Sequence, residues 1–256
     1  MSLPENPIGV QLYTVRKPAA EDFPGVLRQL AEGGAQAVEF AGYGGMETAE
    51  LQALLQELGL RVSGAHISVA VWEGNAEEGL ATLKALGGQY AVVPWVPEER
   101  RNSLAAARTL AASLNVWAAA ARMADLGFAY HHHAFEFDPL PDGDGATLFD
   151  VLAAETDPAL VGFEIDVYWA ARGGQDPAAL LRRMAGRAPL MHLKDVGPAP
   201  DFIDVPAGEG SLDWGDIRAA AREAGVRWEI VEQDNPDPND PVGASLLAVR
   251  NMSRAE

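Results

Sequence analysis

The sequence contains no cysteine. This absence excludes a disulfide-stapled scaffold, a thiolate metal site and a thiol nucleophile. A chain of 256 residues is long enough to bury a substantial core without such cross-links. Any metal site or catalytic group must therefore be built from carboxylate, imidazole, amine and hydroxyl groups.

Long apolar runs are missing as well. No stretch reaches the roughly 18 uninterrupted apolar residues that a transmembrane helix requires. The N-terminal segment "MSLPENPIGV" lacks a basic region followed by an apolar one, so no secretory signal is expected. Together these absences predict a cytoplasmic protein that does not use a membrane as a partner.

Positive charge is scarce. The chain has 19 Lys and Arg residues against 37 Asp and Glu residues, and its formal net charge is −18. Nucleic-acid affinity comes largely from Lys and Arg side chains that neutralise phosphates, so no nucleic-acid partner is expected. The excess carboxylates solvate the surface, or some of them build a metal site, and the two interpretations are compatible.

Short apolar runs recur at a steady spacing along the chain. There are eight of them, at 8–14, 35–42, 61–67, 90–96, 127–133, 161–169, 189–195 and 228–234. Between them lie stretches with helical periodicity, at 23–33, 47–59, 76–88, 103–127, 146–155, 176–186 and 213–225. This alternation predicts βα units and a parallel sheet. Eight units favour a closed (β/α)8 TIM barrel, with residues 1–256 as a single domain and an open doubly wound sheet as the alternative.

Chemically reactive side chains gather late in these runs, and the C-terminal ends of the strands carry the site in such a barrel. All five histidines fall at or near these ends: His66, His131, His132, His133 and His192. So do a lysine and several carboxylates, namely Glu39, Glu136, Glu164, Asp166, Lys194, Asp195, Glu229, Glu232 and Asp234. A rim of imidazole and carboxylate groups suits one divalent cation such as Mn, Co, Zn or Mg.

Alternation along each strand sorts these side chains by face. His131 and His133 share a face, and His132 points the other way. Glu164 and Asp166 likewise share a face. Parity alone does not identify the inward face, because a strand that is buried on both sides shows no amphipathic pattern.

Seven segments between residues 8 and 234 form a series: "IGVQLYTVR", "AVEFAGYGG", "YHHHAFEF", "GFEIDVYWAARGGQDP", "MHLKD", "VPAGEGSLDW" and "EIVEQD". Their order and spacing resemble the xylose isomerase-like TIM barrels, the sugar phosphate isomerase/epimerase group. The resemblance implies one divalent metal held by one side chain from each of strands five to eight. Motif by motif, it points to Asp166, His192 and Glu232. Many members have a glutamate on strand five, where this chain has His131, and Glu136 in the following loop is the alternative ligand.

The resemblance also implies the chemistry, which is the removal of a proton next to a sugar carbonyl through an enediolate. Glu232 is then the candidate base, and Glu136, His133 and His66 are candidates for the partner acid. Candidate substrate contacts are Glu39, His66, Lys194, Tyr168 and Trp169. Each of them has a structural alternative: an ion pair of Lys194 with Asp195 or Glu164, orientation of His66 by Glu39, and core or interface packing for the two aromatic residues.

Other functions stay open at this stage. A lyase of the inosose dehydratase kind begins with the same proton abstraction but expels a hydroxyl group. A sugar-binding or metal-binding barrel without catalysis is a further alternative, since fold and site do not by themselves determine function. An endonuclease acting at abasic sites is disfavoured by the charge of −18 and by only five histidines. The segment 197–211 contains no Lys or Arg, which favours an unphosphorylated sugar or polyol as the small-molecule substrate. A homodimer would be ordinary for the family.

Overall fold

Eight parallel strands close into a barrel in the computed structural model, which describes residues 6–254. The barrel strands are β1 (Ile8–Gln11), β2 (Ala37–Phe40), β3 (Arg61–His66), β4 (Tyr90–Val93), β5 (Gly127–His131), β6 (Val161–Asp166), β7 (Leu190–Leu193) and β10 (Trp228–Val231). Strand β1 pairs with both β2 and β10, so the sheet has no edge. The eight predicted runs and the TIM barrel are thereby confirmed, and the open sheet is excluded.

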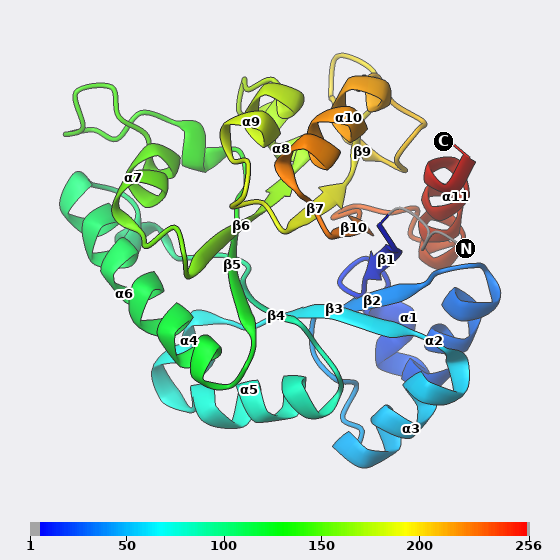
Figure 1. The fold of residues 1–256 in the computed structure, drawn as a ribbon. Coiled ribbons are helices and arrows are strands. Elements are labelled where there is room, and N and C mark those ends of the chain that lie inside the picture. The colour runs from blue at the N-terminus through cyan, green and yellow to red at the C-terminus, as the bar shows by residue number, and fades with distance from the viewer. Residues whose placement is uncertain (1–5, 255–256) are drawn as a thin grey trace.

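Helices surround the strands as an outer ring (Figure 1). They are α1 (Arg16–Glu21), α2 (Phe23–Glu32), α3 (Thr48–Leu58), α4 (Val69–Gly74), α5 (Ala76–Ala85), α6 (Leu104–Met123), α7 (Leu148–Glu155), α8 (Val167–Arg172), α9 (Pro177–Arg183), α10 (Trp214–Ala224) and α11 (Pro241–Arg254). Every predicted helical stretch contains one of them, whereas α1, α4, α8 and α11 were not predicted. Among the described residues, no helix is both long enough and apolar enough to cross a membrane.

Two smaller features follow strands β5 and β7. A 3₁₀ turn (Phe135–Phe137) comes after β5, and a second such turn (Glu98–Arg100) precedes α6. After β7, the antiparallel strands β8 (Asp195–Val196) and β9 (Asp204–Val205) form a hairpin beyond the barrel. The turn after β5 begins next to the predicted site residues His131 and His133, and the hairpin begins next to His192 and Lys194.

The sixth strand is shorter than predicted. The run at 161–169 was expected to be one strand, but β6 ends at Asp166 and helix α8 begins at once. The Asp166 carboxylate accepts a hydrogen bond from the Trp169 backbone N–H at 2.9 Å and so caps the new helix. Tyr168 and Trp169 therefore belong to a helical turn and do not extend the strand.

The barrel interior is identified by a small apolar cluster that comes from strands alone: Ala37, Tyr90, Val92, Ala129, Leu190, Trp228 and Ile230. A second, larger core fills the space between the strands and the helices. Ile230 points into the barrel. Glu232 lies two residues further along and therefore faces inward as well. Glu229 faces outward, and its carboxylate pairs with Arg218 at 3.1 Å. The structure thus settles the inward face that the sequence left open.

Gly64 in β3 marks a place where two strands approach closely. A Cβ atom added there would collide with the Tyr90 backbone carbonyl and come within 3.3 Å of Glu39 Oε1. We expect Gly64→Ala to lower the free energy of unfolding by about 2 kcal/mol, because overpacked cores must shift backbone. Thermal unfolding checks this expectation, with Gly74→Ala as the control, since a Cβ at that helical position meets nothing within 4 Å. Equal melting temperatures for the two variants would contradict it.

Candidate functional site

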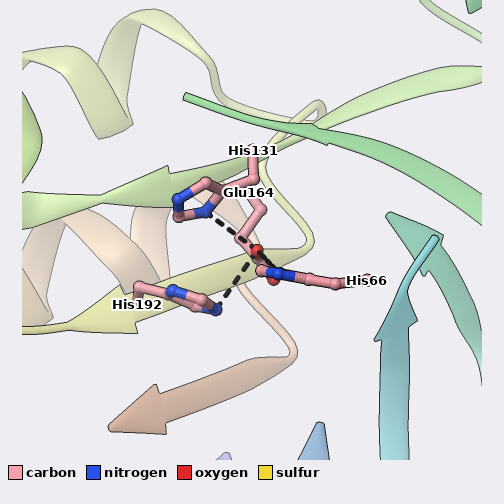
Figure 2. A group of neighbouring side chains, drawn as sticks. All are labelled: His66, His131, Glu164 and His192. Atoms are coloured by element: carbon pink, nitrogen blue, oxygen red, sulfur yellow. Dashed lines mark hydrogen bonds and ion pairs between the residues drawn. The ribbon is translucent and has the colours of Figure 1, made fainter. Parts of the chain in front are cut away.

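The C-terminal ends of five strands bring ionisable side chains together inside the barrel. Within the described residues, two groups of four have ligand atoms that all lie within 4.8 Å of one another. The first group, called the Asp166 group below, is His131, Asp166, His192 and Glu232. The second, called the Glu164 group, is His66, His131, Glu164 and His192 (Figure 2). The two groups share His131 and His192.

The Asp166 group contains the three side chains that the family resemblance named as metal ligands, together with His131, the ligand expected on strand five. His192 Nδ1 lies 2.9 Å from Glu232 Oε2 and 3.9 Å from Asp166 Oδ2. The register places Asp166 directly beside His192 on the neighbouring strand. All four side chains are buried. The group therefore offers two imidazoles and two carboxylates to one small volume.

The Glu164 group lies around a single carboxylate oxygen. Glu164 Oε2 is 2.9 Å from His66 Nε2, 3.0 Å from His131 Nδ1 and 3.1 Å from His192 Nε2. Dashed lines mark these three contacts in Figure 2. This central position was not predicted, although the shared parity of Glu164 with Asp166 was a usable signal. The three contacts make Glu164 the residue that orients the imidazoles.

Glu39 lies under the same imidazoles and is fully buried. Its Oε2 atom lies 2.8 Å from His192 Nε2 and 3.3 Å from His66 Nε2, and it accepts a hydrogen bond from Gln11 Nε2 at 2.8 Å. Of the two roles considered from the sequence, these contacts match the orientation of histidine. Gln11 is a further member of this network that the sequence did not single out.

The two ring nitrogens of His192 face different pairs of carboxylates. Nδ1 faces Asp166 and Glu232, and Nε2 faces Glu39 and Glu164. A metal-ligating histidine almost always donates its other ring N–H to a carboxylate or carbonyl group, and this arrangement provides such an acceptor. The residues thus fit a divalent cation at the Asp166 group, with Glu39 and Glu164 supporting its histidines from below.

Burial and neighbouring charges act in opposition on these groups. Burial would lower the pKa of His66, but Glu39 and Glu164 raise it to about 10. Burial would raise the pKa of Glu232, but Lys194 and His192 hold it well below its usual value. The neighbouring charges therefore favour the charged form of both side chains, against the effect of burial.

Lys194 is fully buried among carboxylates. Its Nζ atom lies 3.0 Å from Asp166 Oδ2, 2.8 Å from Glu232 Oε2 and 2.7 Å from Asp234 Oδ2. The contact between Asp166 Oδ2 and the ammonium is an ion pair without hydrogen-bond geometry, because this oxygen has no hydrogen-bond partner among the described residues. The two ion-pair partners predicted from the sequence, Asp195 and Glu164, are wrong. Asp195 turns away from the lysine, and the Glu164 carboxylate faces the histidines.

Asp195 instead ties down the segment that follows β8. Its carboxylate accepts hydrogen bonds from the backbone N–H groups of Val196, Gly208 and Leu212, and from Trp214 Nε1 at 2.7 Å. Four donors on one buried carboxylate make it the anchor of this loop.

We expect Asp195→Ala to loosen residues 197–212 and to cost at least about 2 kcal/mol, since hydrogen bonds to charged groups are the stronger ones. Amide hydrogen exchange across 197–212 measures this loosening directly. Asp201→Ala is the control, because that side chain is exposed in the same loop. Unchanged exchange in the Asp195 variant would show that other contacts hold the loop.

The three consecutive histidines divide as the alternation predicts. His131 enters both groups of four, whereas His132 packs on Phe137 and Phe149 in the outer layer. His132 Nε2 accepts a hydrogen bond from the Asp166 backbone N–H at 3.2 Å, so it supports the end of β6. His133 stacks on Phe135, and burial together with Lys194 lowers the pKa of His133 to about 3.

Glu136 lies outside both groups. Its Oε1 atom accepts a hydrogen bond from the Tyr130 hydroxyl at 2.8 Å, and its Oε2 atom accepts one from the His133 backbone N–H at 2.7 Å. Burial raises the pKa of Glu136 to about 7. The structure therefore places this carboxylate where it shapes the turn after β5, rather than beside the four candidate ligands, and His131 takes the strand-five position.

A cavity of about 370 Å³ opens above the Asp166 group. Its walls include His66, His131, His133, Glu232 and Asp234, and Tyr13 and Trp95 also line it. Tyr13 and Trp95 are 42% and 50% exposed. None of the described residues that line this cavity is Lys or Arg.

The aromatic walls of this cavity differ from those named in the sequence. Tyr168 and Trp169 are not among its lining residues. The Tyr168 hydroxyl donates to the Phe202 carbonyl at 3.1 Å, and the Trp169 ring lies 5.4 Å from that of His133. Tyr13 and Trp95 follow strands β1 and β4, and their place just past a strand end was the signal that could have found them.

Known proteins resemble this chain in sequence and in fold. The model of the xylose isomerase-like TIM barrel family matches residues 27–252. An inosose dehydratase from Geobacillus kaustophilus (strain HTA426) is 29% identical over 269 residues, covering 90% of this chain and 84% of that protein.

Solved structures are similar across nearly the whole chain. A sugar phosphate isomerase/epimerase from Parabacteroides distasonis ATCC 8503 superposes with a TM-score of 0.82 at 22% identity, covering 100% of this chain and 98% of the other. The IOLI protein, crystallised with a bound zinc atom, superposes with a TM-score of 0.71 at 13% identity, covering 97% of each chain. Identities this low show a common fold.

Proposed function

The chain belongs to the xylose isomerase-like TIM barrel family, and from this premise we propose that it is a divalent-metal-dependent sugar isomerase or epimerase. The observation that carries the proposal is the Asp166 group, whose two imidazoles and two carboxylates converge beneath an open cavity. We infer that His131, Asp166, His192 and Glu232 hold one Mn, Co, Zn or Mg ion, because this mixed donor set suits all four ions.

A cation bound by these residues would act as a Lewis acid toward the carbonyl oxygen and an adjacent hydroxyl of a sugar. Glu232 lines the cavity and is the candidate base that removes the proton from the neighbouring carbon. A proton delivered to the adjacent carbon then completes an isomerisation. A proton delivered by a partner acid to the opposite face of the same carbon completes an epimerisation. His66 and His133 also line the cavity. His66, whose pKa Glu39 and Glu164 raise, is the candidate for the partner acid, whereas the lowered pKa of His133 suits it to contact the substrate as a neutral ring.

Lys194, Glu39 and Glu164 have supporting roles in this proposal. Lys194 is fully buried next to Glu232 and is not among the residues that line the cavity, so it is the candidate that favours the ionised form of the Glu232 carboxylate. Glu39 and Glu164 hold the rings of His66 and His192, so the imidazoles keep one orientation during the reaction. Glu136 has no part in this proposal.

The cavity favours an unphosphorylated keto-sugar or polyol. Two carboxylates, Glu232 and Asp234, stand in its walls, and they would repel a phosphate group. Tyr13 and Trp95 offer flat apolar faces of the kind that pack against the C–H faces of a sugar ring. The segment 197–211 adds no Lys or Arg.

A second candidate is a lyase of the inosose dehydratase kind. The similarity to the Geobacillus kaustophilus inosose dehydratase supports it. The strand-five histidine supports it as well, because His131 stands where a second proton-shuttling carboxylate would be expected. The first step by Glu232 is common to both candidates, and only the fate of the intermediate differs.

Product mass separates the candidates. We expect the metal-loaded protein, incubated with unphosphorylated keto-sugars and inososes, to give a product of unchanged mass by mass spectrometry and a shifted chromatographic position. A product lighter by one water would establish the lyase instead. Treatment with a chelator should stop either reaction, and re-addition of Mn or Zn should restore it. Binding without any turnover would contradict both and identify a catalytically silent barrel.

A further inference from the structure

The position of Lys194 has a consequence for metal binding. Its ammonium group is fully buried and is surrounded by the carboxylates of Asp166, Glu232 and Asp234 at 3.0, 2.8 and 2.7 Å. Two of these three, Asp166 and Glu232, belong to the Asp166 group. A lysine thus contacts half of the candidate metal ligands.

The oxygens that face Lys194 are the same oxygens that face Nδ1 of His192. Glu232 Oε2 lies 2.8 Å from Lys194 Nζ and 2.9 Å from His192 Nδ1. Asp166 Oδ2 lies 3.0 Å from the ammonium and 3.9 Å from that nitrogen. A divalent cation held by these side chains and the ammonium would therefore compete for the same two carboxylates, and their like charges repel strongly in a buried site.

The third carboxylate, Asp234, offers the ammonium a partner outside the candidate ligand set. Its position is well defined, because the Asp204 carboxylate accepts hydrogen bonds from the backbone N–H groups of Asp234 at 2.6 Å and Asn235 at 3.1 Å. Arg16 also donates to the Asp234 carbonyl at 3.0 Å. Asp234 lines the substrate cavity as well.

We propose that Lys194 is a built-in competitor for the catalytic metal. Its ammonium neutralises Asp166 and Glu232 until a divalent cation takes their oxygens, and Asp234 then retains the ammonium beside the substrate cavity. The inference rests on the proposed metal at the Asp166 group. It assigns Asp234 a positioning role: this carboxylate draws Lys194 away from the metal ligands and toward the substrate.

Metal affinity tests the competition without any need for a substrate. Lys194→Met removes the charge and keeps an unbranched side chain, and isothermal titration with Mn²⁺ should then show a Kd lower than that of the wild type by about tenfold or more. Lys84→Met is the control for net charge, since Lys84 lies at the surface near Asp125, and its Kd should match the wild type. An unchanged or higher Kd for Lys194→Met would overturn the proposal, because it would mean that the lysine helps to organise the site.

A second variant covers the case in which Lys194→Met does not fold without metal. Asp234→Asn removes the outer partner, so the ammonium should hold Asp166 and Glu232 more tightly and the Mn²⁺ Kd should rise severalfold. Asp201→Asn, at an exposed position, is the matched control. A Kd equal to or lower than that of the wild type in Asp234→Asn would contradict the positioning role.

The outcome for the wild type distinguishes this inference from the proposed function. If the wild type binds no Mn²⁺ while Lys194→Met does, the competition holds and the proposed metal dependence of the native protein fails. If neither protein binds Mn²⁺, both fail. If the wild type binds the ion and the two variants shift its Kd in opposite directions, both stand.

Discussion

Glu232→Gln is expected to abolish turnover and to leave the barrel folded. The change removes the only carboxylate of the Asp166 group that also lines the substrate cavity among the described residues. The loss of a general base typically costs about 10²–10⁴-fold in rate. Because Gln keeps the size of the side chain and one carbonyl oxygen, the contact with His192 Nδ1 is retained, whereas the ion pair with Lys194 is lost, so the melting temperature should fall while the barrel still folds.

The measurement pairs steady-state kinetics with metal content. Turnover that is lost while the metal is retained would assign Glu232 as the base, whereas loss of both would make it chiefly a ligand. Glu229→Gln is the matched control on the same chain segment, because Glu229 faces outward to Arg218. That control should be less stable but should keep its rate per folded molecule. Wild-type turnover in Glu232→Gln would show that the base is another residue.

His131→Ala is expected to remove the bound metal. Elemental analysis of the purified wild type should find about one Mn, Co or Zn ion per chain, held by four side chains in the manner of such sites. His131 belongs to both groups of four, so its loss should empty the site whichever group holds the ion. His132→Ala is the neighbouring control and should retain the metal, since that ring packs among aromatic residues in the outer layer.

Two further variants identify the group that holds the ion. Asp166→Asn changes only the Asp166 group, and Glu164→Gln changes only the Glu164 group. We expect the first to lose the metal and the second to keep it with weaker affinity, because Glu164 orients the imidazoles. The reverse result would move the metal to the Glu164 group. Loss of metal in His132→Ala but not in His131→Ala would reverse the register assigned to the end of β5.

The two sets of experiments require different conditions. The metal content of each variant is measured without a substrate, whereas the comparison of rates requires one. The cytoplasmic location and the homodimer expected from the sequence stay predictions that neither set addresses.

The sequence by itself determined the barrel and the rim at which the site lies. Eight apolar runs at even spacing carry their own strand signal, because a strand buried on both faces reads as a continuous apolar segment. The C-terminal ends of parallel strands meet at one rim, so the late positions of Glu39, His131 and His192 were enough to predict that they lie close together. The family motifs added the expected role of metal ligand for Asp166, His192 and Glu232.

Only the tertiary structure decided which of these side chains contact one another. Glu39 and His192 are 153 residues apart in the chain and 2.8 Å apart in the barrel, and no local pattern encodes that contact. Strand parity gave two possible faces, and barrel closure chose one by burying Ile230 in the interior. Loop residues follow no period at all, which is why Glu136 and Lys194 found partners that the sequence did not predict. Periodicity reports which residues are buried, whereas the contacts between buried charges depend on how distant strands are brought together.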